Sequence, residues 1–401
     1  MANTDTGAPP HPSLLLLVLT STIGPVALNI FMPSMPGMQA YFEVDYATVQ
    51  LTLTFYLLAM AISQVAIGPL SDRFGRRPLL IAGLLIYLLG SMLAVFATSI
   101  TMLILARMVQ GIGGASGIVL SRAIIRDCYS REQSASMIGY VTMGMVVGPL
   151  VSPYIGGLLD ERFGWQASFV LLFGLGAIIL ALVLAFLPET HINRARGGGF
   201  SPLVAGARLL FASPAFWSYT GAISFASGAF FAFLAAAPYI AIELMELPPR
   251  VYGQYFPLGA IGYMTGNFLS GRYSIRVGTD RMIFIGSLVG IGATMLLIAS
   301  TILQIQHPLS LFLPMCIVAL SNGLVMPNAT ARVVSLHPEH AGAASGLAGS
   351  IQLLSGALIT VLVGEIGDGT QLPMAIVMSI ALWMSFLSAR MGRRVVRESE
   401  G

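Results

Sequence analysis

The residue of this chain whose position most needs a chemical explanation is an arginine inside an apolar segment. Arg107 lies about two turns of helix from the nearer end of its segment, and Gln110 follows on the same helix face. An arginine at the centre of a membrane span costs roughly 2.5–3.5 kcal/mol on insertion scales. We therefore expect Arg107 to face an internal cavity, where a guanidinium can bind substrate or take part in proton coupling. The alternative is a side chain that snorkels to the outer surface.

Polar and aromatic side chains at comparable depth are candidates for the wall of the same cavity. We assign to it Asn29, Tyr56, Gln64 and Tyr140; further residues at plausible depth are Gln50, Tyr255, Tyr263, Asn267, Asn322, Asn328 and Gln352. Membrane helices also use such groups for ordinary hydrogen bonds between helices, which is the alternative for each of them. Because Arg107 is the only charge expected at mid-membrane depth, the cavity should prefer neutral or anionic compounds over permanent cations.

A second set of reactive side chains lies in one short loop, from Gly68 to Pro78. An aspartate can pair with arginines and can cap the N-terminus of a helix. The loop therefore offers a charged cluster on the cytoplasmic side; its residues are Gly68, Asp72, Arg73, Gly75, Arg76 and Arg77. The alternative is that these arginines only anchor the loop on the cytoplasmic side.

A third pattern is a stripe of small residues. Gly144, Gly148, Ser152 and Gly156 are spaced four apart, with Pro153 and Gly157 beside them. Residues four apart share one helix face, so the stripe predicts close packing against another helix.

The amino-acid composition indicates the class of protein that contains these residues. The chain of 401 residues is 56% hydrophobic and only 9% charged, whereas a soluble domain carries roughly 25% charged residues. It is therefore expected to be an integral membrane protein. Every basic residue is arginine, and the absence of lysine excludes a P-loop nucleotide site and a Schiff-base cofactor. The histidines fall in loops or tails, so we expect no metal site at membrane depth. No cofactor and no nucleic-acid partner is expected either.

Uninterrupted apolar stretches predict twelve membrane-spanning helices. A span needs about 20 apolar residues, and two stretches that are too long for one span divide at polar breaks, residues 98–101 and 304–308. Seventeen of the twenty arginines then fall on one side, two on the other (Arg162 and Arg250), and Arg107 within a span. Because positive residues mark the cytoplasmic side, both termini are expected to be cytoplasmic.

The chain is expected to divide into two halves of six helices. We predict an N-terminal bundle over residues 1–190, a flexible cytoplasmic linker over 191–212 that contains Gly197–Gly199, and a C-terminal bundle over 213–401. The sequence Leu70–Phe74 is weakly similar to Leu269–Tyr273, which lies at the matching place in the second half. Repeated six-helix halves are one of the known plans of transporters.

The loop Gly68–Pro78 and the segment Arg107–Gly114 together resemble the signatures of the major facilitator superfamily. For the loop this resemblance implies a latch that forms when the cytoplasmic side is closed. The stripe on the fifth span resembles the signature of drug:proton antiporters within it, with Ser152 where that pattern has glycine. Local sequences narrow the resemblance to the bicyclomycin/chloramphenicol-resistance (Bcr/CflA) group: Asn29–Pro33, Arg122–Asp127, Pro188–Thr190 and Phe231–Pro238. One departure stands out, because that group usually has an aspartate, a natural proton carrier, at the position of Asn29.

The resemblance implies an all-α fold of two six-helix bundles around a central cavity. It implies secondary active efflux of small amphipathic compounds across a bacterial inner membrane, by proton antiport and alternating access, from a protein that acts as a monomer. The alternatives are a transporter of a native metabolite with the same fold and a membrane-embedded enzyme. The enzyme is disfavoured because the chain lacks His-Glu-x-x-His, Gly-x-Ser-x-Gly and a pair of carboxylates inside the spans.

Overall fold

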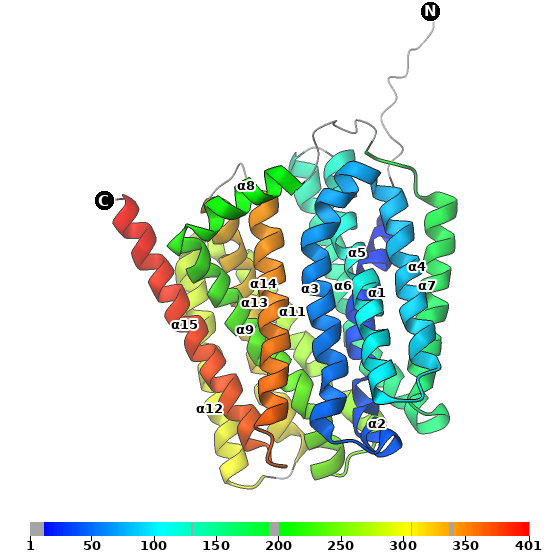
Figure 1. Ribbon diagram of the computed structural model, residues 1–401. Coiled ribbons are helices and arrows are strands. Elements are labelled where there is room, and N and C mark those ends of the chain that lie inside the picture. The colour runs from blue at the N-terminus through cyan, green and yellow to red at the C-terminus, as the bar shows by residue number, and fades with distance from the viewer. Residues whose placement is uncertain (1–11, 130, 192–199, 306, 337–340, 401) are drawn as a thin grey trace, which may run out of the picture.

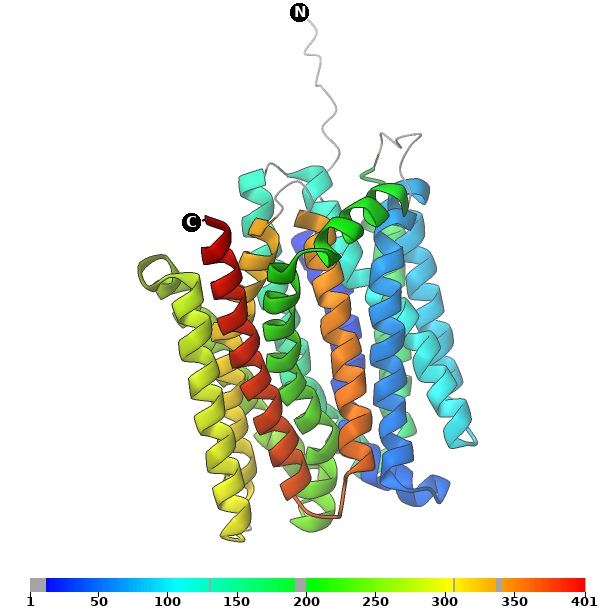
Figure 2. The same cartoon turned by 60° about the vertical axis from the view of Figure 1, so that its left-hand side comes forward.

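The computed structural model describes residues 12–129, 131–191, 200–305, 307–336 and 341–400. These residues form an upright bundle of long helices, with one short helix lying across one end (Figure 1). Figures 1 and 2 show that the first described residues and the end of the last helix lie at the same end of the bundle. We call this end the terminal face and the other end the opposite face.

Within the described ranges, twelve helical spans cross the bundle, as predicted. In the first half they are α1 (Leu14–Asn29) continued by η1 (Met32–Ser34) and α2 (Met35–Phe42), α3 (Tyr46–Phe74), α4 (Arg76–Val95), α5 (Ile100–Cys128), α6 (Arg131–Phe163) and α7 (Gln166–Phe186). In the second half they are α9 (Pro214–Tyr239) continued by η2 (Ile240–Leu244), α11 (Pro257–Val277) preceded by α10 (Pro249–Tyr255), α12 (Thr279–Ile302), α13 (Pro308–Leu336), α14 (Ala341–Glu365) and α15 (Leu372–Glu400). Eleven of the spans are long and apolar enough to cross a membrane, and α11 is the twelfth.

Both predicted polar breaks are confirmed. α4 ends at Val95 and α5 begins at Ile100, where the hydroxyl of Ser99 accepts the backbone N–H of Met102 (3.2 Å) as an N-cap. α12 ends at Ile302 and α13 begins at Pro308. The expected eighth span is two helices, since α10 ends at Tyr255 and α11 starts with a proline after one intervening residue.

The segment between the halves differs from a flexible linker over part of its length. Phe200–Phe211 forms the helix α8, which lies across the terminal face in Figure 1. Leu210 of α8 is fully buried in an apolar cluster of the second half, whereas Val204 and Leu209 are exposed. Burial of one face of α8 accounts for the helix, despite the polar composition just before it. Gly197–Gly199 lies outside the described residues.

Glycines of α5 allow three neighbouring helices to approach it closely. A Cβ at Gly117 would overlap the carbonyl of Thr20 on α1, and one at Gly113 would overlap α4. A Cβ at Gly111 would lie 2.6 Å from the carbonyl of Tyr56 on α3. Such small residues let helix backbones pack tightly in membranes. α5, which carries Arg107, is thus the packed centre of the first half.

Candidate functional site

A pocket with a volume of about 350 Å³ lies near the terminal face, between the two halves. Its walls are the last turns of α3, the last turns of α5 and the first turns of α14. Its polar lining residues are Gln64, Asp72, Arg76, Arg122, Arg126 and Ser345, and its larger apolar ones are Val65, Ile118, Val119 and Leu347. We call it the terminal pocket. A ligand in it would touch both halves of the protein.

Arg76 is the centre of a charged network at the edge of this pocket. Its Nη1 donates to Asp72 Oδ1 (2.6 Å) and its Nε donates to Asp127 Oδ2 (2.9 Å). Its backbone N–H donates to Glu189 Oε1 (3.0 Å), and the guanidinium also donates to Ser71. The network joins the ends of α3, α5 and the segment after α7 to the start of α4, all within the first half.

The predicted pairing of Asp72 with an arginine is therefore present. Its predicted capping of a helix N-terminus is absent from the described residues in this conformation, where Asp72 bonds only to Arg76 and its side chain is about half exposed. Asp72 nevertheless lines the pocket together with the first turn of α14, which begins at Ala341. The N-terminal turn of α14 and Asp72 thus border the same pocket.

The other residues of the loop shape the turn or bind outside the network. Gly75 has φ 99°, a left-handed backbone that side chains rarely adopt, so glycine lets α3 pass directly into α4. Gly68 lines the terminal pocket. Arg77 donates to a backbone carbonyl of α7 (2.8 Å), and the guanidinium carbon of Arg73 lies 5.3 Å from the ring centre of Phe74.

Arg107 is enclosed by aromatic rings inside the first half. The side chain is 0% exposed. Its guanidinium carbon lies 4.1 Å from the ring centre of Tyr56, 4.3 Å from that of Phe31 and 5.8 Å from that of Phe169. These are cation–π distances, and the rings come from α3, α7 and the segment after α1. No ion pair to Arg107 occurs among the described residues, so aromatic faces stabilise its charge where a carboxylate is absent.

Hydrogen bonds continue from Arg107 to α4. Arg107 donates to Gln110 Oε1, and Gln110 Nε2 donates to Ser91 Oγ (2.8 Å), which donates to a backbone carbonyl of α4 (2.9 Å). Neither Arg107 nor Gln110 lines either of the two described pockets. In this conformation Arg107 is thus fully buried and contacts neither of these two pockets, and its side chain does not snorkel. The reason is that the α5 glycines bring aromatic neighbours close enough to enclose it.

The remaining predicted cavity residues lie in different places. Gln64 lines the terminal pocket. Tyr56 and Asn29 are buried within the first half, where Tyr56 Oη (2.9 Å) and Asn29 Nδ2 (2.7 Å) both donate to backbone carbonyls of α1. Tyr140 is 54% exposed on α6 and lines neither described pocket.

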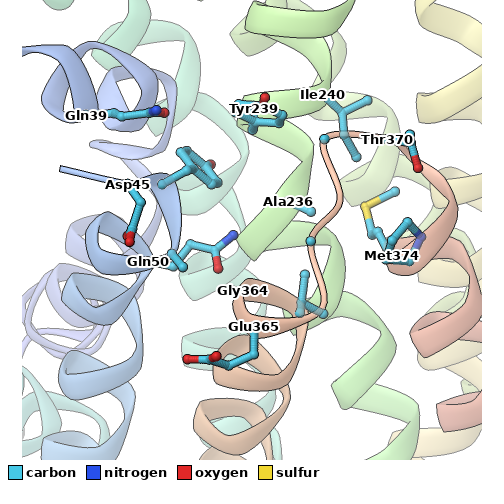
Figure 3. A pocket seen from close by; sticks show the side chains of 16 residues that line it. Gln39, Asp45, Gln50, Ala236, Tyr239, Ile240, Gly364, Glu365, Thr370 and Met374 are labelled. Atoms are coloured by element: carbon cyan, nitrogen blue, oxygen red, sulfur yellow. The ribbon is translucent and has the colours of Figure 1, made fainter.

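A second pocket of about 440 Å³ lies at the opposite face, and the two halves are hydrogen-bonded to each other beside it. Gln50 Nε2 donates to the carbonyl of Ala235 (2.8 Å), and the hydroxyls of Thr54 and Thr360 share a hydrogen bond (2.7 Å). Figure 3 shows Gln50 reaching from α3 towards Ala236 and Gly364 of the second half. We call this space the opposite pocket. α3 is fastened to α9 and α14 at this face.

The stripe on α6 packs closely on another helix, as its spacing predicts. A Cβ at Gly144 would lie 2.5 Å from Val18 of α1, and Cβ atoms at Gly148 and Gly156 would overlap atoms of α1 and of the residue after it. Ser152 is buried in the same row, one residue before Pro153. Gly157 faces the second half, where its Cβ would lie 2.5 Å from the carbonyl at the start of α10. α6 therefore forms a second contact between the halves.

Some residues of these two pockets were not singled out by the sequence analysis. Arg122 and Arg126 contributed only to the expected orientation in the membrane and to the family resemblance. Both are exposed lining residues of the terminal pocket. Their spacing of four was the available signal, because it places both on one helix face. No local pattern pointed to Thr54 and Thr360, which lie far apart in the chain.

Comparison with known proteins gives consistent results. The family model of the Major Facilitator Superfamily matches residues 17–360. A bicyclomycin resistance protein homolog of Haemophilus influenzae is 30% identical over 380 residues, 94% of each chain. A chloramphenicol resistance protein of Pseudomonas aeruginosa is 31% identical over 360 residues, 88% of this chain and 82% of that one. A bacterial homologue of the human lysosomal transporter Spinster has a similar fold, with TM-score 0.76, 18% identity and coverage of 97% and 99%.

Proposed function

This chain belongs to the major facilitator superfamily, in its Bcr/CflA group, and on that premise we propose that it exports small amphipathic compounds from the cytoplasm of a bacterium. Membership makes it a multi-pass membrane transporter and not an enzyme. The resistance proteins among its relatives support drugs as one class of cargo. The protein acts in the inner membrane, as a monomer.

The observation that carries this proposal is the difference between the two ends of the interface between the halves. Gln50, Thr54 and Gly157 join the halves towards the opposite face. Towards the terminal face the halves are separated by the terminal pocket. The arginine distribution supports a cytoplasmic terminal face. In the described conformation the halves are then hydrogen-bonded to each other beside the opposite pocket on the outside, and the terminal pocket separates them on the cytoplasmic side, as in an exporter that is ready to load.

Alternating access would close the terminal face and open the opposite face. Rocking of one half against the other brings Asp72 towards the N-terminus of α14, where its carboxylate can accept backbone N–H groups and interact with the helix dipole. The same motion separates Gln50 from Ala235 and Thr54 from Thr360. The Arg76 network lies within the first half and can move as one body with it.

Proton antiport is the driving force that the family resemblance implies. Asn29 cannot carry a proton in place of the usual aspartate, and it is buried beside the carbonyl that it binds. The acids that line the two described pockets are Asp72 at the terminal face and Asp45 and Glu365 at the opposite face. Of these acids Glu365 is the carrier to test first, with Glu365→Gln as the test variant and Asp45→Asn as its control, because hydrogen bonds hold the pKa of Asp45 below its usual value.

A drug-susceptibility panel tests the proposal. Expression in an efflux-deficient host should raise the inhibitory concentration of several neutral or anionic antibiotics, and a protonophore should remove the effect. Asp72→Asn at equal protein level serves as the inactive control. If no compound is less toxic and the same cells take up a metabolite, the result would instead favour an importer of a native metabolite.

A further inference from the structure

We propose that the terminal pocket selects cargo with an anionic group, and that Arg122 and Arg126 bind that group. The inference rests on the proposed export function and adds to it the chemical class of the substrate. A sulfonate, a carboxylate and a phosphate share the chemistry that the site recognises, which is several negative oxygens on one atom.

The two arginines are placed together on one wall of the pocket. Arg122 and Arg126 are four residues apart on α5, so their side chains project from the same helix face. Arg126 Nε donates to the carbonyl of Arg122 (3.4 Å), and both side chains are exposed lining residues. Two like charges at this spacing repel each other, and an anion bound between them removes that repulsion.

Their charges are not balanced by any carboxylate that the structure describes. Arg76, in the same pocket, is neutralised by Asp72 and Asp127. In the described part of the chain no ion pair involves Arg122 or Arg126. The pocket lining therefore carries an excess of positive charge that is available to a ligand.

The second half presents a complementary surface across the pocket. A Cβ at Gly342 would lie 3.2 Å from Arg126 Nη1, so the guanidinium of the first half already reaches the first turn of α14. The first backbone N–H groups of a helix have no partner within the helix, and they favour an anion over a guanidinium. An anionic group between Arg126 and α14 would satisfy both partners.

The apolar walls explain why the cargo should be amphipathic. Val65, Ile118, Val119 and Leu347 line the same pocket as the two arginines. An aromatic or aliphatic body can pack on these side chains while the anionic group binds the guanidinium groups. A planar guanidinium also gives two parallel hydrogen bonds to such oxygens.

The opposite pocket carries charge of the other sign. Asp45 and Glu365 line it, and its described lining contains no arginine or histidine. Hydrogen bonds from the side chain and the backbone N–H of Thr48 hold the pKa of Asp45 below its usual value, so this carboxylate stays ionised at neutral pH. An anion is thus attracted at the terminal face and repelled at the opposite face, which favours release and disfavours return.

A matched pair of fluorescent probes tests the inference in everted membrane vesicles. Anilinonaphthalene sulfonate and N-phenylnaphthylamine share the same aromatic body and differ by the sulfonate. The test variant is Arg122→Gln with Arg126→Gln. Its control is Arg208→Gln with Arg390→Gln, which removes the same charge from exposed positions outside both pockets.

We expect the test variant to raise KM for the sulfonate by about tenfold or more, because each charge-assisted hydrogen bond is strong. The maximal rate should change less, since the arginines lie at the loading end. Transport of N-phenylnaphthylamine should stay within about twofold in all proteins. The variant Arg122→Lys with Arg126→Lys should restore part of the affinity, because lysine keeps the positive charge but lacks the planar guanidinium.

Three outcomes would overturn the inference and leave the export function intact. The first is equal KM for the sulfonate in the wild type and the test variant, with N-phenylnaphthylamine still transported. The second is transport of the neutral probe alone by the wild type. The third is loss of sulfonate transport by the purified protein when anionic lipid replaces zwitterionic lipid in reconstituted vesicles, which would assign the arginines to a lipid headgroup. Failure of the wild type to move either probe would instead contradict the proposed function.

Discussion

The guanidinium carbon of Arg107 lies 4.1 Å from the centre of the Tyr56 ring. The hydroxyl of that tyrosine donates to a carbonyl of α1 (2.9 Å), so one aromatic residue both stabilises a buried charge and joins α3 to α1. Phe31 lies on the same guanidinium at 4.3 Å, and Gln110 accepts a hydrogen bond from it. Arg107 is thus a joint between α5, α3 and the segment after α1.

Replacing Arg107 by lysine should weaken this joint. An ammonium cannot lie flat against two rings and also keep the bond to Gln110, so we expect a loss of about 1–3 kcal/mol of stability and reduced transport of every substrate alike. Thermal unfolding of the purified protein measures the first effect and vesicle flux the second. Tyr56→Phe keeps the ring and should cost less. A lysine variant with wild-type melting temperature and flux would show that the rings contribute nothing.

Asp72→Asn should leave the protein folded and lower its transport strongly. Arg76 keeps its bond to Asp127 in this variant, which preserves the network within the first half. The closed cytoplasmic state, however, loses the charge that we propose caps α14 there, and initial flux should fall by about tenfold or more. Arg73→Gln, at an exposed residue outside the network, is the matched control. Unchanged flux from well-expressed Asp72→Asn would mean that the loop only anchors the protein.

Gly156→Ala should be far more harmful than Gly139→Ala, although both lie on α6. A Cβ at Gly156 would overlap the carbonyl of Ile30, whereas one at Gly139 would meet no atom within 4 Å. Overpacking of this kind costs roughly 1–3 kcal/mol. Melting temperature and the amount of folded protein in the membrane report the difference. Equal behaviour of the two variants would contradict the close packing of α6 on the first span.

The contact between Gln50 and Gly364 allows a double-mutant cycle at the opposite face. A Cβ at Gly364 would overlap Gln50 Oε1, so Gly364→Ala should open this face. Adding Gln50→Ala removes the overlap and should restore closure in part, although the bond to Ala235 is lost. The readout is the thiol-labelling rate of Ala236→Cys, a lining residue of the opposite pocket, with Cys128 and Cys316 replaced by serine. Additive effects of the two substitutions would show that the residues do not interact.

Sequence alone determined the class of the protein and the number and limits of most of its spans. A helix needs about 20 apolar residues to cross a bilayer and satisfies its backbone hydrogen bonds internally, so the spans can be located from the apolar stretches without knowledge of packing. The breaks before Ile100 and after Ile302 follow from the same rule. The α6 stripe was also predictable as a packing surface, because a spacing of four defines a helix face.

What covers each helix face was decided only by the tertiary structure. The pattern placed Arg107 at mid-membrane depth, yet three aromatic residues from three other segments decide that it is sealed inside the first half instead of facing the cavity. Gln50 and Ala235 meet across 185 residues of sequence, and no local pattern encodes such a pair. The physical reason is that helical periodicity fixes the direction of a side chain relative to its own helix axis. The neighbour that it meets depends on how all twelve spans pack.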